Sequence, residues 1–353
     1  MRATAMTVNI LVVILCAVSA ANIQPIFLNS DPTPASLLSR QVVRRPPESA
    51  VILDDVPTSR WTYGCAATAA GMMFGYYDRS GYPDMYTGWA NKGVAPLRDL
   101  GRRSALIASQ KNRDRNRNLG HVNDYWIRYG RTGPDPYVTK GRQEHTRDCV
   151  ADFLGTNQWK WDFLGSDGVI DFNIDGSTAL WAYSSSGAKL YDYIPPASAG
   201  LPQTALCHGL KLFAESRGYW VSENYTQRID TLFEDGFSFE DFKAEIDAAK
   251  PVMVQLQGHS MVGVGYDDAD SIIYVHDTWD NRLHWMQWGQ SYAGMAQVAV
   301  TVLHLEEPLV SGPGGQLDLQ PSGQLQAIPE PTTVGLFILG AMFLRLPSAT
   351  RKT

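Results

Sequence analysis

The pattern of hydrophobic and polar positions predicts one helix and two strands most clearly. Residues 66–77 are rich in alanine and include several large apolar side chains, which predicts a helix that begins near Cys65. Residues 251–266 are rich in valine and bounded by turn signals, and a second apolar run follows at 270–277. These two runs predict neighbouring strands of a hairpin.

Cys65 lies where a loop gives way to the predicted helix. In the first turn of a helix, unpaired N–H groups and the helix dipole favour an anion, so a thiol there is a candidate nucleophile. The dipole contributes only about 0.3–1 kcal/mol at an exposed site, which is less than one pKa unit. A reactive Cys65 therefore also needs a base with which it can form an ion pair.

His259 is the candidate base, and Asp277 is the candidate residue that orients it. If Tyr266 pairs with Asp270 across a three-residue loop, counting outward along the hairpin places His259 directly opposite Asp277. Cross-strand neighbours on one face have Cβ atoms about 4.5–5.5 Å apart, so a carboxylate there could hold one imidazole tautomer. A slip of one residue would move Asp277 to the other face.

Three motifs occur in the order expected for a known family. They are YGCAATAAGM at 63–72, GHSMVGVGYD at 258–267 and VHDTW at 275–279. Together they resemble papain-like cysteine peptidases, most closely the bacteriocin-leader-processing-like, C39-like group, over residues 51–305 with a long insertion around 80–230. The resemblance implies an α+β fold in which a helix carries the nucleophile at its N-terminus and packs on an antiparallel sheet. It also implies that Cys65 is the nucleophile, His259 the general base and Asp277 the third member, acting on a peptide or protein without a required cofactor.

The chain departs from this family at the oxyanion site. Papain-like enzymes usually carry a glutamine shortly before the cysteine, and residues 58–64 contain none. The N–H of Cys65 would then act together with Ser59, Trp61 or Thr62; losing one such donor typically costs about 10²–10³ in rate. Two other classes remain open: a non-hydrolytic surface or matrix protein on a decayed peptidase scaffold, and a transglutaminase-like or amidase-like acyl transferase.

The chain ends predict export. Arg2, an apolar stretch at 8–18 and small residues up to Ala21 are typical of a secretory signal peptide over 1–21. Proline-rich residues 22–50 and residues 308–328 are expected to be linkers around a domain at 51–307.

The C-terminal tail, 329–353, is similar to the PEP-CTERM sorting signal of exported bacterial envelope proteins. It has Pro329-Glu330-Pro331, an apolar segment at 334–344 and a basic end. This apolar segment is too short to span a hydrocarbon core of about 30 Å upright. The resemblance implies transient anchoring, processing by an exosortase-type membrane enzyme, and release to the envelope, the matrix or the exterior.

Charge and cysteine content narrow the alternatives. The net charge of −6 argues against a nucleic-acid partner. Three cysteines follow the predicted signal peptide, and a disulfide between Cys149 and Cys207 would leave Cys65 as a thiol. His145 and Cys149 are four residues apart, and we interpret them as ordinary helix residues rather than as a rival dyad or part of a metal site.

A weak calcium-loop pattern lies in the insertion. Asp171, Asn173 and Asp175 offer oxygen ligands at alternating positions, and Gly176 follows. An EF-hand would place a glutamate at the twelfth position, which here is Ala182, and residues 178–183 look like a strand. A hairpin turn is therefore the favoured interpretation, with a weak structural calcium site as the alternative.

Overall fold

The computed structural model describes residues 23–28, 40–88, 90–98, 106–107, 149–156, 176–195 and 205–306. All of them belong to a unit that ends at Pro308. Several expectations concern residues outside these ranges: the signal peptide, the linker at 308–328, the sorting tail, His145, and the calcium candidates Asp171, Asn173 and Asp175. None of the described helices is long and apolar enough to cross a membrane.

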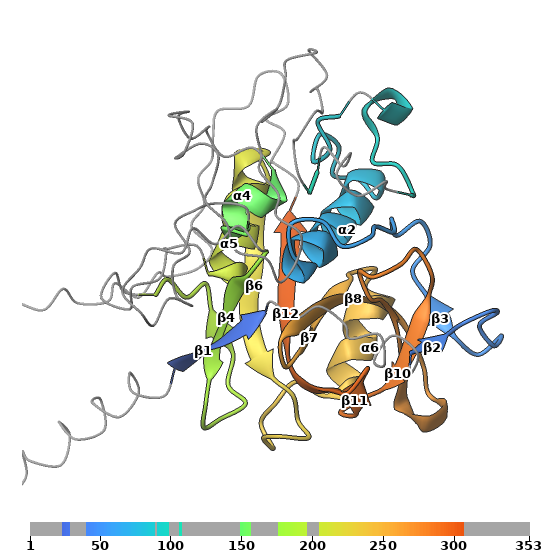
Figure 1. The fold of residues 1–353 in the computed structure, drawn as a ribbon, viewed down its shortest axis with the longest axis vertical. Coiled ribbons are helices and arrows are strands. Elements are labelled where there is room, and N and C mark those ends of the chain that lie inside the picture. The colour runs from blue at the N-terminus through green and yellow to red at the C-terminus, as the bar shows by residue number, and fades with distance from the viewer. Residues whose placement is uncertain are drawn as a thin grey trace, which may run out of the picture. The chain divides into compact units, whose positions relative to one another are not determined.

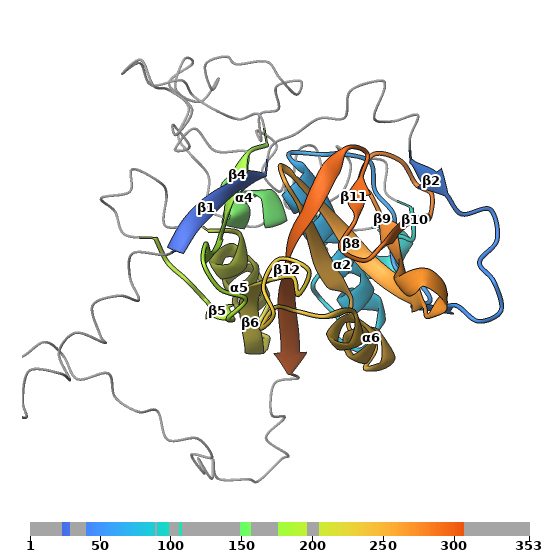
Figure 2. The same cartoon turned by 90° about the horizontal axis from the view of Figure 1, so that it is seen from below.

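An antiparallel sheet forms the centre of the fold (Figure 1). Within the described residues its main path runs β2-β10-β9-β8-β7-β12-β6-β5, while β3 pairs with β8 and β11 with β12. The strands are β2 (Gln41–Val42), β3 (Val51–Ile52), β5 (Leu190–Tyr191), β6 (Trp220–Arg228), β7 (Val252–Leu256), β8 (His259–Asp267), β9 (Ile272–His276), β10 (His284–Gln287), β11 (Ser291–Tyr292) and β12 (Met295–Glu306). A separate antiparallel pair joins β1 (Ile23–Leu28) to β4 (Thr178–Tyr183) (Figure 2).

Four α-helices are described, together with two short 3₁₀ turns, η2 (Ala90–Gly93) and η4 (Ala269–Ser271). The helices are α2 (Cys65–Arg79), α4 (Val150–Leu154), α5 (Leu206–Ser216) and α6 (Phe239–Asp247). Every residue of α2 except the last is buried, as expected for a helix whose alanines allow close packing. It contacts β7, β8 and α4, while α4 and α5 lie together beside β6 (Figure 1).

The sheet separates two hydrophobic cores at β7. Val252, Val254 and Leu256 belong to a cluster that includes Phe242 of α6. Met253, between them in the sequence, belongs to the cluster that includes the side chains of α2. This alternation is the two-residue period of a strand buried on both faces. As a result, α2 is fixed against one face of the strands that carry the candidate base.

The structure confirms that the helix begins at Cys65 and that strands occupy 252–256, 259–267 and 272–276. The α+β class is confirmed as well, and the architecture is consistent with a papain-like, C39-like fold. Residues 178–183 form a strand as expected.

Part of the segment expected to be a linker is strand instead. β1 and β2 lie within 22–50, and β1 pairs with β4 along its full length. The prolines dominated the sequence pattern there, although proline is tolerated in a strand at the edge of a sheet. Pro25 lies in β1, a strand of a two-stranded sheet. Residues 23–28 and 41–42 are thus paired with strands of the folded domain.

Candidate active site

Cys65 is the first residue of α2 and is only 1% exposed. Gly64 precedes it with a φ of 115°, a conformation that favours glycine. A Cβ added at Gly64 would overlap the carbonyl oxygen of Gly176, so the two backbones are in close contact. Thr68 fixes the same loop: its Oγ1 accepts from the N–H of Thr62 at 2.8 Å and donates to the carbonyl of Gly64 at 2.7 Å.

The start of α2 remains suited to an anion. No acidic residue lies in its first turn, and no side chain caps it. The first intrahelical bond runs from the N–H of Thr68 to the carbonyl of Gly64, so the preceding N–H groups have no acceptor within the helix. These groups and the dipole favour a thiolate or an oxyanion next to Cys65.

Hydrogen bonds near the other end of α2 fix its direction on the sheet. The hydroxyl of Tyr76 donates to the carbonyl of Ala249, just before β7, and that of Tyr77 donates to the main chain of β12 near its end. β7 runs away from this end of the sheet, and β8 returns toward it. The C-terminal part of α2 thus lies at the end of the sheet where β7 begins, and His259 begins β8 at the opposite end.

His259 is completely buried, and a hydrogen bond and a ring stack help to hold it. Its Nε2 lies 3.0 Å from the main-chain carbonyl oxygen of Asp277, and its ring stacks on Trp279 with centroids 4.1 Å apart. Since a carbonyl oxygen only accepts, Nε2 carries the proton in this hydrogen bond. In the neutral ring Nδ1 is then the nitrogen that can accept a proton.

The predicted pairing of His259 with Asp277 across the hairpin is wrong. Val262 pairs with His276 and Asp267 with Ile272, because η4 lengthens the turn and a bulge interrupts the register between Gly263 and Gly265. The structure still brings Asp277 to His259, but through its main-chain carbonyl.

The carboxylate of Asp277 has other partners. Its Oδ2 accepts from Nη1 of Arg40 at 2.7 Å and from the hydroxyl of Tyr292 at 2.8 Å. Its Oδ1 accepts from the N–H of Trp279 at 3.1 Å. Burial, followed by the charge of Asp277, raises the pKa of Tyr292, which keeps this hydroxyl a donor.

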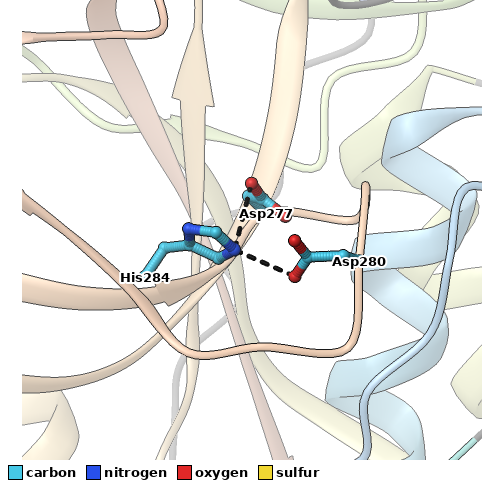
Figure 3. Close-up of side chains that lie close together, drawn as sticks. All are labelled: Asp277, Asp280 and His284. Atoms are coloured by element: carbon cyan, nitrogen blue, oxygen red, sulfur yellow. Dashed lines mark hydrogen bonds and ion pairs between the residues drawn. The ribbon is translucent and has the colours of Figure 1, made fainter. Parts of the chain in front are cut away.

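Asp280 and His284 complete this polar cluster, and the sequence analysis missed both. Nε2 of His284 lies 2.9 Å from Oδ1 of Asp280 and 3.5 Å from Oδ2 of Asp277 (Figure 3). Burial alone would raise the pKa of Asp280, but the hydrogen bond and charge of His284, with the charge of Arg40, lower it overall. The only sequence signal was their position just after the VHDTW motif.

The three residues of Figure 3 have the composition of a metal site, since their ligand atoms lie within 4.8 Å of one another. However, Nη1 of Arg40 lies 2.7 Å from Asp277 and 3.3 Å from Asp280. The guanidinium already supplies a positive charge between the carboxylates. We therefore interpret the cluster as an ion-pair network.

Two of the three candidate oxyanion donors are already hydrogen-bonded. The hydroxyls of Ser59 and Thr62 both donate to the carbonyl of Arg60, at 3.2 and 2.9 Å. The third candidate, Trp61, is half-buried. Either hydroxyl would have to rotate before it could donate to a substrate.

The other described cysteines are also thiols. The structure contains no disulfide among Cys65, Cys149 and Cys207. Cys207 donates to Oδ1 of Asn224 at 3.0 Å, and burial, followed by the charge of Asp192, raises its pKa to about 12. Cys207 is therefore an inert thiol at neutral pH.

A small hollow lies beside the middle of α2, lined by Gly71, Met72 and Gly75 among others. Its lining includes neither Cys65 nor His259. It is therefore separate from the candidate site.

One comparison with known protein families supports the resemblance to C39-like peptidases. Residues 196–300 match the model of the Peptidase_C39 like family. The matched segment contains His259, Asp277 and the Asp280–His284 pair, whereas Cys65 and Arg40 precede it. Comparisons with curated proteins and with solved structures found no match.

Proposed function

We propose that the protein is an exported cysteine peptidase that uses Cys65 and His259. The observation that supports this proposal is the setting of each residue: Cys65 starts a helix with no acid in its first turn, that helix packs on β8, and β8 begins with His259, which the carbonyl of Asp277 fixes. The family match over 196–300 supports the same activity. Asp277 contributes through its carbonyl rather than its carboxylate.

The reaction follows from these positions. With the proton of Cys65 transferred to Nδ1 of His259, the thiolate attacks the scissile carbonyl carbon, and the N–H at the start of α2 stabilises the oxyanion. The His259 cation then protonates the leaving amine, which leaves a thioester on Cys65. His259 next takes a proton from water, and the resulting hydroxide attacks the thioester. The carboxylic acid is released and the thiol restored.

A peptide that carries an epoxide tests this proposal. At neutral pH the probe should label Cys65 and leave Cys207 unlabelled, as read by peptide mapping in a mass spectrometer. His259→Ala should reduce the labelling, because the ion pair is lost. Equal labelling of the two thiols, or none in the folded protein, would count against the enzyme.

A second candidate is a non-hydrolytic protein on a peptidase scaffold. The burial of both Cys65 and His259 favours it, as do the occupied hydroxyls of Ser59 and Thr62. In that case protein and peptide substrates remain intact while the fold is stable. If Cys65 is reactive but supplied amines are incorporated instead of peptide bonds being cut, the acyl-transferase alternative is correct.

Export and sorting form a separate part of the proposal and are supported only by the sequence of the chain ends. A mature protein that lacks residues 1–21 and the tail after about Pro331 is expected. The intact mass of protein from its natural host measures this directly. A mass that includes 334–353, in protein extracted only with detergent, would show a retained anchor.

A further inference from the structure

Arg40 is the one charged residue from the N-terminal segment that reaches the surroundings of His259 among the contacts described. Its side chain is 13% exposed, and Nη1 makes the short contact with Oδ2 of Asp277. Its guanidinium carbon also lies 5.6 Å from the centroid of Trp279, within the range of a cation–π interaction. Arg40 thus interacts with Asp277 and with Trp279, which both contact His259.

The backbone delivers Arg40 to this position. It directly precedes β2, whose Gln41 and Val42 pair with Trp285 and His284 of β10. The N–H of Val43 continues the pairing with a bond of 2.9 Å to Leu283. Because β10 also carries His284, the segment that contains Arg40 is joined directly to the polar cluster.

The contact between Arg40 and Asp277 is important because it neutralises negative charge in the site. Asp277 and Asp280 are two carboxylates close together in a largely buried site, where like charges repel strongly. Burial lowers the pKa of Arg40, but the hydrogen bond and charge of Asp277 raise it overall, so the guanidinium stays charged. Without it, the carboxylate of Asp277 would lose this cation, keep the neutral donors of Tyr292 and Trp279, and be held less firmly away from the His259 ring.

We propose that Arg40 is a positioning residue of the candidate active site: it holds the Asp277 carboxylate away from His259 and leaves the main-chain carbonyl to orient that ring. This inference rests on the proposed cysteine peptidase function. Arg40 does not contact substrate. It acts through Asp277 and Trp279.

The charged and titratable groups around His259 determine the direction in which the pH profile should move when Arg40 is removed. Asp277 and Asp280 come from the turn after β9, His284 from β10, Tyr292 from β11 and Arg40 from before β2, and the proposed nucleophile Cys65 begins α2. Removing Arg40 takes away a cation and leaves a carboxylate uncompensated, so the His259 cation becomes more stable. The alkaline limb of kcat/KM, which reports loss of that cation, should move to higher pH by about one unit.

The experiment compares Arg40→Ala, Arg40→Gln and wild type. Both variants should show the shifted limb and a kcat about tenfold lower, since the ring is less well oriented. Guanidinium at millimolar concentration should restore the wild-type profile of Arg40→Ala, whereas sodium chloride at equal concentration should not. Arg44→Ala is the matched control, because Arg44 is an exposed arginine of the same segment. Arg40→Gln removes the charge but keeps a polar amide on a shorter side chain, so it tests the proposal even if Arg40→Ala does not fold.

A second readout separates this inference from the proposed function. NMR titration of the His259 ring measures the same change without turnover. If wild type cleaves nothing but the ring titrates at higher pH in the variants, the positioning role stands and the peptidase proposal fails. If the variants fold and are merely less stable, with His259 titrating as in wild type, Arg40 is only structural and the inference is wrong.

Discussion

The three described cysteines all lie at helix starts, and their surroundings differ in charge. Cys65 is the first residue of α2, Cys149 is the N-cap of α4, and Cys207 is the second residue of α5. Asp152 accepts from the N–H of Cys149 at 3.2 Å, so a carboxylate already occupies that helix start. The thiol of Cys207 bonds to Asn224 near the charge of Asp192. Of the helices that the structure describes, α2 and α5 lack an acid in the first turn, and α2 packs on β8, the strand that begins with His259.

The comparison shows that a helix N-terminus alone does not make a nucleophile. The helix dipole lowers the pKa of a thiol by less than one unit. Burial and a neighbouring carboxylate, in contrast, raise the pKa of Cys207 to about 12. The difference between the thiols therefore depends on which residues the tertiary fold places beside each helix start.

The strongest way to break the comparison is to remove each thiol in turn. Cys65→Ala should lower peptidase kcat/KM by at least about 10³-fold, because the nucleophile is lost. Cys207→Ala and Cys149→Ala should stay within about threefold, although each removes buried contacts and lowers stability by about 1 kcal/mol. Steady-state kinetics with matched melting curves measures both. Wild-type turnover in Cys65→Ala would exclude it as the nucleophile.

Reactivity toward iodoacetamide sharpens the comparison without a substrate. Cys65, if paired with His259, should be alkylated rapidly near pH 7, at least about a hundredfold faster than Cys207. Cys207 should resist labelling in the folded protein up to about pH 10, because its raised pKa keeps the thiol protonated. Peptide-resolved mass spectrometry gives both rates. A Cys65 rate that rises only above the ordinary thiol pKa of about 8.5 would favour the scaffold function.

The N-cap residues provide a third test, because glycine precedes Cys65. Gly64→Ala should destabilise the fold by about 2–4 kcal/mol, since it combines a positive φ with overlap against Gly176. Gly218→Ala is the control: its φ is +87° and a Cβ there would meet nothing within 4 Å, so about 1 kcal/mol is expected. Denaturant unfolding measures the difference. Equal losses would show that the contact with Gly176 does not hold the Cys65 loop.

The smallest expected effect concerns Asp192, beside Cys207. Burial raises its pKa, but hydrogen bonds from His208 and Lys211 lower it overall. A lowered folded pKa means that the ionised form stabilises the protein above the unfolded value of about 3.9, and that this contribution is lost as the pH falls through the folded value. Asp192→Asn should remove about 1 kcal/mol or less at pH 7, since the site is partly exposed, and should flatten the change in Tm below about pH 4. A wild-type and variant Tm that fall in parallel between pH 5 and 3 would contradict this.

The local elements could be predicted because their patterns are local. About a dozen residues of sequence are enough to recognise an alanine-rich helix that follows a glycine, and the same holds for the two valine-rich strands. The register between β8 and β9 could not be predicted, because it depends on η4 and on a bulge at Gly263–Gly265. Both features follow from packing. The sequence analysis therefore expected His259 next to the Asp277 carboxylate, whereas the hydrogen bond is made by the main-chain carbonyl of Asp277.

Arg40 and β1 were missed for a different reason. Proline content governed the interpretation of 22–50, and neither segment pairs with a neighbour in sequence. From the sequence, the partner of Arg40 is limited only to residues of opposite charge, and any of the 36 acidic residues could fill that role. Without coordinates, nothing distinguished Asp277 from the rest.

The distance along the chain between Arg40 and Asp277, 237 positions, also bears on how the protein is made. The ribosome releases the nucleophile helix long before the strands that carry the base, and contacts between remote segments form late and slowly in folding. In a partly synthesised or unfolded chain, the Cys65 thiol is therefore present before His259 and Arg40 have reached their folded positions. For the proposed peptidase, the order of synthesis keeps the nascent chain unreactive toward its neighbours until the whole domain has closed.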